Sequence, residues 1–230
     1  MRLSIAFLLL SIHCTTIGFH EDSIRNSMEF GQMREIKVCT ISENGIEAEE
    51  IVSLFSYWNE ELKLYALRAI YVDQGKMDRP GLTGFDILAY LYTVPLTREC
   101  DRILYLKGRQ WKDLIYEFFT LGIFAGIGIK VEMQGAIETH TNTRGYIKAK
   151  YISTLQLLFT SPKSTLVHEG YHLLGCGHQL FMQACYEDIL KLKSLSAQPE
   201  VEAGFFPSRT NSGDLFLRRQ EVNGVFYKKD

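Results

Sequence analysis

HEGYHLLGCGH, residues 168–178, is the stretch of this sequence from which the fold is best read, and it holds three of the six histidines of the chain. Residues four apart share one face of a helix, so His168 and His172 can reach the same metal ion. Gly175 can adopt the left-handed conformation that ends many helices, which lets the chain turn and bring in His178. The pattern therefore predicts three imidazole ligands on one ion.

Glu169 adds a possible catalytic group to these ligands. It follows the first histidine directly, so it points to one side of the shared helix face and can hold a metal-bound water. Three protein nitrogens leave the fourth tetrahedral position of Zn²⁺ open, as in catalytic rather than structural zinc sites. Ser161-Pro162 is the predicted start of the helix. The alternative is a buried helix whose histidines are only hydrogen-bonded.

The pattern HExxHxxGxxH resembles the zinc signature of the metzincin clan of metallopeptidases. The resemblance implies that the three histidines bind zinc and that Glu169 is the general base and then the general acid. It also implies a turn containing methionine beneath the metal, for which Met182 is the only candidate after His178. The close spacing is loosely similar to archaemetzincins, although their second, cysteine-built zinc site has no counterpart because no cysteine follows Cys185.

The activity implied is that of a zinc-dependent metalloendopeptidase, whose substrate is a peptide or protein. We expect an extended substrate to add a strand to the sheet at residues 129–139. Two alternatives stay open: a zinc hydrolase of another zincin class, with downstream Glu187 as third ligand, or a catalytically inactive, secreted zinc-binding protein. Tyr171 is expected to pack, and Tyr186 either packs or stabilises the oxyanion.

The N-terminus has the pattern of a secretory signal peptide, predicted at residues 1–18. Arg2 is followed by an apolar run at residues 3–12, which is shorter than the about 20 residues that a membrane span needs. Thr16-Ile17-Gly18 offers small residues for cleavage. The other interpretation of this stretch is a buried N-terminal helix or strand.

The predicted domain plan is an extension at residues 19–34 and a catalytic domain at residues 35–230. We expect a secreted or periplasmic protein without a membrane span. Two alternatives remain: a lipid anchor on Cys14, or translation from Met28, which would leave a cytoplasmic enzyme.

Four cysteines remain beyond the predicted signal peptide, and an even number in an oxidising compartment favours disulfides, with three possible connectivities. A bond between Cys176 and Cys185 would fasten the loop that carries His178. Cys39 would then pair with Cys100. The alternative is four buried free thiols.

Composition agrees with one folded domain, because 46% of the residues are hydrophobic and 23% are charged. The net charge of −2 argues against a nucleic-acid partner, and we expect a monomer.

The remaining pattern predicts an α/β fold (α+β, zincin-like). Its parts would be a mixed, mostly parallel sheet, a backing helix, the zinc-binding helix and a small C-terminal helical subdomain. Strands are predicted at residues 35–42, 67–72, 102–106, 129–133 and 146–152, and helices at 47–63, 85–92, 111–121 and 186–195. Residues 73–84 and the tail from Ser196 are predicted to be irregular.

Overall fold

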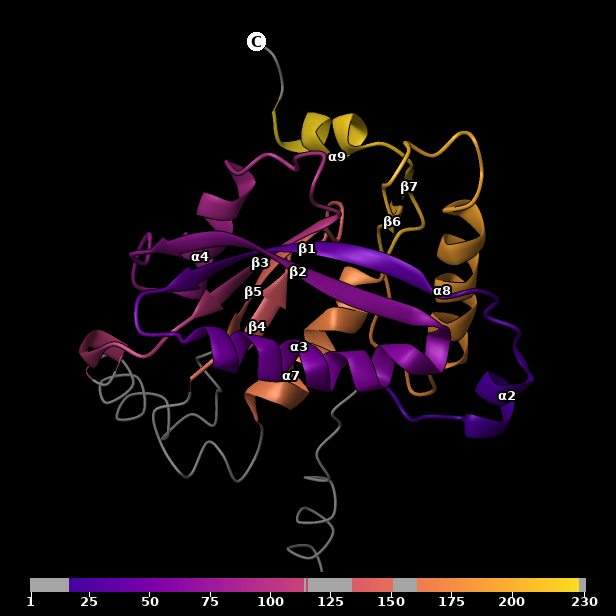
Figure 1. Cartoon of the computed structure of the whole chain (residues 1–230), viewed down its shortest axis with the longest axis horizontal. Coiled ribbons are helices and arrows are strands. Elements are labelled where there is room, and N and C mark those ends of the chain that lie inside the picture. The colour runs from indigo at the N-terminus through magenta and orange to yellow at the C-terminus, as the bar shows by residue number, and fades with distance from the viewer. Residues whose placement is uncertain (1–16, 114, 116–133, 151–160, 228–230) are drawn as a thin grey trace, which may run out of the picture.

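A mixed five-stranded sheet forms the centre of the protein (Figure 1). The computed structural model describes residues 17–113, 115, 134–150 and 161–227. The strand order is β2-β1-β3-β5-β4, and only β4, at one edge, is antiparallel to its neighbour. The strands are β1 (Arg34–Glu43), β2 (Leu67–Met77), β3 (Arg102–Lys107), β4 (Gly135–Ile137) and β5 (Arg144–Lys148). The prediction of a mixed, mostly parallel α/β sheet is confirmed.

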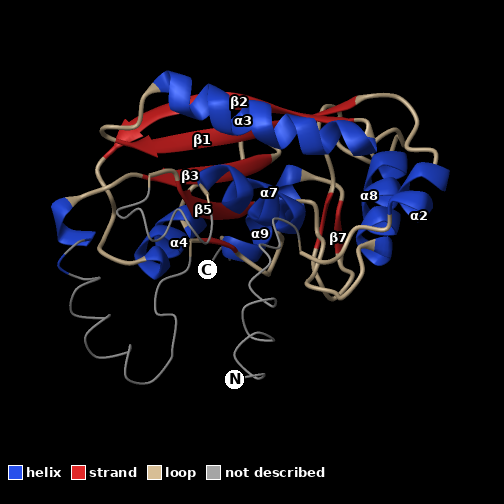
Figure 2. Ribbon diagram, turned by 90° about the horizontal axis from the view of Figure 1, so that it is seen from below, coloured by secondary structure: helices blue, strands red, loops and turns tan. Residues whose placement is uncertain are grey.

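Helices cover both faces of this sheet (Figures 1 and 2). One face carries α3 (Ala48–Leu62) and α7 (Pro162–Leu173), and the other carries α4 (Gly84–Tyr92) and α9 (Arg219–Phe226). Successive residues of a strand point to opposite faces. Accordingly, Leu104 of β3 belongs to the core under α3 and α7, while Tyr105 belongs to the core under α4.

The C-terminal part lies beside one end of the sheet (Figure 1). It contains α8 and a small two-stranded sheet, and the short helices α2 and η1 contact α8. Their bounds are α2 (Asp22–Ser27), η1 (Lys63–Tyr65), α8 (Gln183–Leu195), β6 (Ser208–Arg209) and β7 (Leu215–Phe216).

Several parts of the fold differ from the predictions: β4 lies in no predicted strand, and α2 lies in the stretch predicted only as an extension. Strand β2 continues to Met77, through residues predicted as a loop, because it is an edge strand: its outer residues face solvent and need no apolar side chains. The tail predicted as irregular contains β6, β7 and α9. The elements predicted at residues 111–121 and 129–133 and the end of the one at 146–152 lie wholly or largely outside the described residues.

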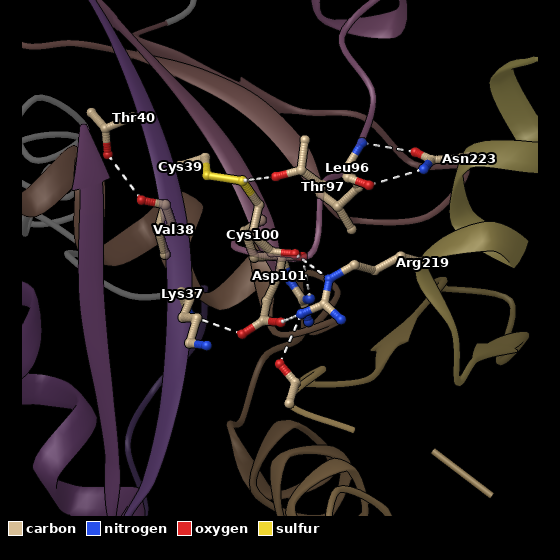
Figure 3. Close-up of a disulfide and its surroundings, with 12 residues drawn as sticks. Lys37, Val38, Cys39, Thr40, Leu96, Thr97, Cys100, Asp101, Arg219 and Asn223 are labelled. Carbon is tan, nitrogen blue, oxygen red and sulfur yellow. Dashed lines mark hydrogen bonds and ion pairs between the residues drawn. A yellow bond between two sulfur atoms is a disulfide. The ribbon is translucent and has the colours of Figure 1, made fainter. Parts of the chain in front are cut away.

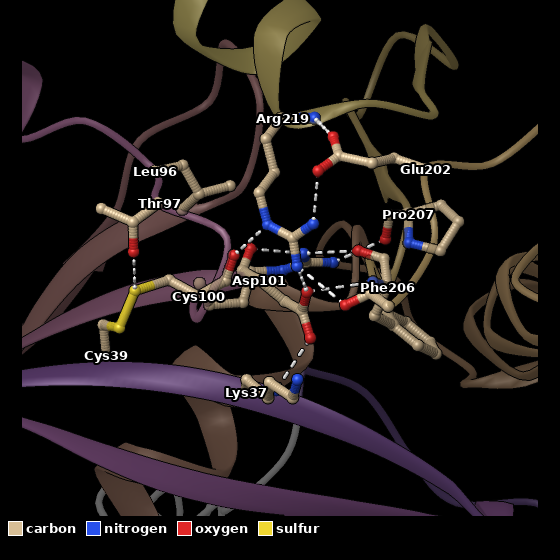
Figure 4. Close-up of polar contacts among 12 residues, drawn as sticks. Lys37, Cys39, Leu96, Thr97, Cys100, Asp101, Glu202, Phe206, Pro207 and Arg219 are labelled. Atoms are coloured by element: carbon tan, nitrogen blue, oxygen red, sulfur yellow. Dashed lines mark hydrogen bonds and ion pairs between the residues drawn. A yellow bond between two sulfur atoms is a disulfide. The ribbon is translucent and has the colours of Figure 1, made fainter.

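The C-terminal tail is fastened to the sheet near the start of β3 (Figures 3 and 4). Arg219 donates to the Asp101 carboxylate and to Glu202, each at 2.8 Å, and to the Cys100 carbonyl at 2.7 Å. Cys100 is itself bonded to Cys39 of β1. This buried ion pair joins the C-terminal tail to the start of β3, and each charge has its opposite partner.

The neighbouring Arg102 connects this region to the end of α7. Its side chain is fully buried and donates to the Leu173 carbonyl at 2.7 Å, while other nitrogens donate to the carbonyls of Phe206 and Pro207. The guanidinium thus satisfies the Leu173 carbonyl at the end of α7, where the intrahelical partner is missing, and two carbonyls in the chain before β6.

Two disulfides are present, Cys39–Cys100 and Cys176–Cys185, so the structure shows this pairing and not the four free thiols that the sequence left open as the alternative. Disulfides persist in oxidising compartments, so they favour an extracytoplasmic protein. Among the described helices, none combines the length and apolar character needed to cross a membrane.

Candidate metal centre

Helix α7 carries the first two histidines and begins where the sequence predicts. Ser161 is the N-cap, and its hydroxyl accepts from the Ser164 amide at 3.0 Å, while Pro162 is the first helical residue. The helix ends at Leu173, and Gly175 has a φ of 81°, the left-handed conformation expected of a glycine at this position. The chain therefore turns sharply just before the third histidine.

The three histidines converge. The ring centroids of His168 and His172 lie 5.1 Å apart, those of His168 and His178 lie 5.0 Å apart, and those of His172 and His178 lie 4.7 Å apart. One nitrogen from each ring lies within 4.8 Å of the other two, so the group could hold a metal ion. The side chains of His168 and His172 are partly buried, and His178 is exposed.

The hydrogen bond of His172 suits metal binding. Its Nδ1 lies 2.7 Å from the Cys176 carbonyl oxygen, which can only accept, so Nδ1 carries the proton and Nε2 is left for a metal. Burial, together with the two neighbouring imidazoles, lowers the pKa of His172 to about 4. The ring is therefore neutral at physiological pH, which is the form that binds metals.

Glu169 is buried beside the histidines, with a relative exposure of 7%. It packs against Gly135 of β4, where a methyl group would lie 2.7 Å from the Glu169 Cγ. The absence of a side chain at Gly135 thus makes room for the carboxylate. Burial raises the pKa of Glu169 to about 8, and a divalent cation nearby would oppose this shift by favouring the charged form. Such a carboxyl can accept and return a proton near neutral pH.

Tyr171 and Tyr186 are both packing residues. Tyr171 is 2% exposed, and its hydroxyl contacts the Glu61 carboxylate and lies 2.8 Å from the Tyr65 hydroxyl. Tyr186 has no exposed surface, and its hydroxyl lies 2.9 Å from His20 Nδ1. The packing role predicted for Tyr171 is confirmed. No sequence pattern pointed to His20, because its partners lie far along the chain.

Met182 and Glu187 are the other predicted candidates. Met182 is 1% exposed, is the N-cap residue of α8 and belongs to the same core as the buried apolar residues of α7. Its role as the methionine beneath the metal stays a prediction. Glu187 is exposed and accepts a hydrogen bond from Gln183 at 3.0 Å, and it is not part of the histidine group.

Neither models of protein families nor curated proteins match this chain. The functional interpretation therefore depends on the residues of the centre and their geometry.

Proposed function

We propose that the protein is a secreted zinc metalloendopeptidase of the metzincin clan. The observation that carries this proposal is the convergence of His168, His172 and His178 next to the buried carboxylate of Glu169. A metal site that served only structure would be expected to have four protein ligands and would have no use for such a carboxylate.

Zinc is the metal that this donor set fits best. Neutral imidazole nitrogen is a preferred ligand of Zn²⁺, and three protein ligands with one open side are typical of its catalytic sites. Bound Zn²⁺ polarises a substrate carbonyl and lowers the pKa of a bound water.

The chain itself supplies the proton transfers. In this proposal Glu169 would take a proton from the attacking water and return it to the leaving nitrogen of the cleaved peptide bond. The hydrogen bond from His172 to the Cys176 carbonyl keeps that ring oriented. Gly135 allows the carboxylate to lie against β4, and a fixed position of the acid–base group contributes to the rate.

A peptide in extended form is the substrate that this geometry favours. Strand β4 is an edge strand, so one of its sides is free to pair within the described sheet, and it lies directly beside Glu169. A peptide that adds a strand here would place its backbone carbonyl near the proposed metal. The candidate edge at residues 129–139 includes β4, although residues 129–133 lie outside the described part of the chain.

The test combines metal analysis with digestion of a peptide library, with and without a chelator. We expect about one zinc per chain and cleavage that the chelator abolishes. Glu169→Gln should keep the metal and lose activity, whereas Glu187→Gln, a matched change at an exposed carboxylate, should keep both. His178→Ala should lose metal.

Two outcomes would favour the alternatives. Unchanged zinc in His178→Ala together with zinc loss in Glu187→Gln would indicate the other zincin class. Stoichiometric zinc without any cleavage, in the wild type as in Glu169→Gln, would indicate a zinc-binding protein without activity.

A further inference from the structure

Residues 17–21, here called the N-terminal strap, run alongside residues 179–182, which follow the third histidine directly. Phe19 and Phe181 form a parallel β-bridge. Three backbone hydrogen bonds join the two segments: Phe19 donates to Leu180 at 2.9 Å, Met182 donates to Phe19 at 3.0 Å, and Gln179 donates to Ile17 at 3.3 Å. The strap thus pairs with the segment that directly follows His178.

The strap is itself anchored to the scaffold. Ile17 is 5% exposed and belongs to the main core. The His20 ring stacks on Tyr186 of α8, with centroids 6.2 Å apart, and its Nδ1 lies 2.9 Å from the Tyr186 hydroxyl. Its other ring nitrogen lies 3.4 Å from the Glu61 carboxylate of α3. Three separate parts of the fold therefore determine where the strap lies.

The third ligand needs such support more than the other two do. His168 and His172 are held by the hydrogen bonds of α7, whereas His178 lies between α7 and α8 in a segment without helix. For residues 177–181, the backbone–backbone hydrogen bonds shown by the structure all go to the strap. A loop without these bonds would have to be ordered when metal binds. Ordering the backbone of one residue lowers the binding constant by about tenfold.

We propose that the N-terminal strap positions the third metal ligand, so that metal affinity depends on residues 17–21. This inference rests on the metal centre of the proposed function. It adds a group of positioning residues about 160 positions away from the HExxHxxGxxH pattern in the sequence.

The contact between Gly18 and Gln179 offers a precise perturbation. A methyl group at position 18 would lie 2.5 Å from the Gln179 carbonyl oxygen, so Gly18→Ala must push the strap away from the loop. Gly224→Ala is the matched control, because a methyl group there meets no atom within 4 Å. Tyr186→Phe is a second variant, which keeps the ring but removes the hydroxyl that contacts His20 and the Glu21 amide.

Three measurements are made on the full chain. They are Zn²⁺ affinity by competition with a chelator, the visible spectrum of the Co²⁺-substituted protein, and amide hydrogen exchange of residues 179–182 without metal. For Gly18→Ala we expect about tenfold weaker affinity or more, a changed Co²⁺ spectrum and about tenfold faster exchange. Tyr186→Phe should shift all three in the same direction by less, and Gly224→Ala should match the wild type.

The outcomes separate this inference from the proposed function. Affinity, spectrum and exchange within about twofold of the wild type in both Gly18→Ala and Tyr186→Phe would overturn the role of the strap. If Gly18→Ala does not fold, Tyr186→Phe decides alone by the same criterion. Strap-dependent metal binding in a protein that cleaves no peptide would support the strap and contradict the peptidase.

Discussion

Removing the two disulfides one at a time should separate the stability of the fold from the geometry of the metal centre. The perturbations are two double variants, Cys39→Ala with Cys100→Ala and Cys176→Ala with Cys185→Ala. All four cysteines are at most 2% exposed, so the loss of buried sulfur is similar in both. The two disulfides differ in the length of the loop that each closes and in their position relative to the metal centre.

Loop length sets the expected loss of stability. The Cys39–Cys100 bond spans 61 positions and the Cys176–Cys185 bond spans 9. From the loop-closure entropy of the unfolded chain, these bonds contribute about 4.3 and about 2.6 kcal/mol respectively. Denaturant unfolding of the metal-free proteins should therefore show the larger loss for the Cys39–Cys100 variant.

Metal affinity should follow the opposite order. The Cys176–Cys185 bond encloses His178, and the Cys176 carbonyl accepts the hydrogen bond of His172. Without this disulfide, the loop can become mobile in the folded protein and must then be ordered again when metal binds. The cost of that ordering is at most the loop-closure term of about 2.6 kcal/mol, which corresponds to an affinity about 100-fold weaker. The Cys39–Cys100 bond lies by the start of β3, and its loss should change affinity by less than about threefold.

The measurement is Zn²⁺ competition with a chelator, under conditions in which both variants remain folded. Two results would refute the reasoning: equal affinity in the two variants, or weaker binding in the Cys39–Cys100 variant. The first would mean that the strap and the packing of the loop hold His178 without the disulfide.

Three further predictions follow from single contacts. Gly135→Ala should reduce peptide hydrolysis by about 10- to 100-fold with unchanged zinc content, because its methyl group would displace the Glu169 carboxylate; loss of zinc would contradict this. Burial, with the Glu43 carboxylate nearby, raises the pKa of Tyr105 above its ordinary value of 10.0. The unfolded chain therefore releases this proton at lower pH than the folded protein does, and the free energy of unfolding falls as pH rises above about 10. Tyr105→Phe should make that fall shallower in denaturant titrations. The sequence predicts a signal peptide that ends at residue 18, but a cut there would remove Ile17, whose side chain lies in the core. Mass spectrometry of the secreted protein should therefore find Ile17-Gly18 retained, with cleavage at an earlier residue.

Much of the sheet and its first helix could be predicted because local pattern and tertiary burial agree there. Strand β1 and helix α3 differ by at most one residue at each end from the ranges that periodicity indicates. In α3 the apolar stripe of Ile51, Phe55, Trp58 and Leu62 is buried, and Leu54 is buried beside it. Helix α7 was found for another reason: its cap, its proline and its terminal glycine all mark its ends.

The incorrect secondary-structure predictions concern residues whose structure depends on pairing with distant parts of the chain. The last residues of β2 look like a loop because a solvent-facing edge strand needs no apolar alternation, and only pairing with β1 extends the strand to Met77. The tail after α8 looks irregular because β6 and β7 are two residues each. Its position depends on Arg219 and Asp101, which are more than 100 residues apart.

The metal centre depends both on local sequence pattern and on contacts between distant parts of the chain. Its donors could be predicted because one turn of helix and one glycine bring them together locally. Their orientation depends on distant contacts, as position 170 illustrates. The chemistry of the metal puts no requirement on this position, yet a methyl group at Gly170 would lie 2.4 Å from the Trp58 indole nitrogen. Glycine is therefore required there by the close packing of α7 on α3, and this packing helps to position the helix whose Glu169 lies against Gly135 of β4.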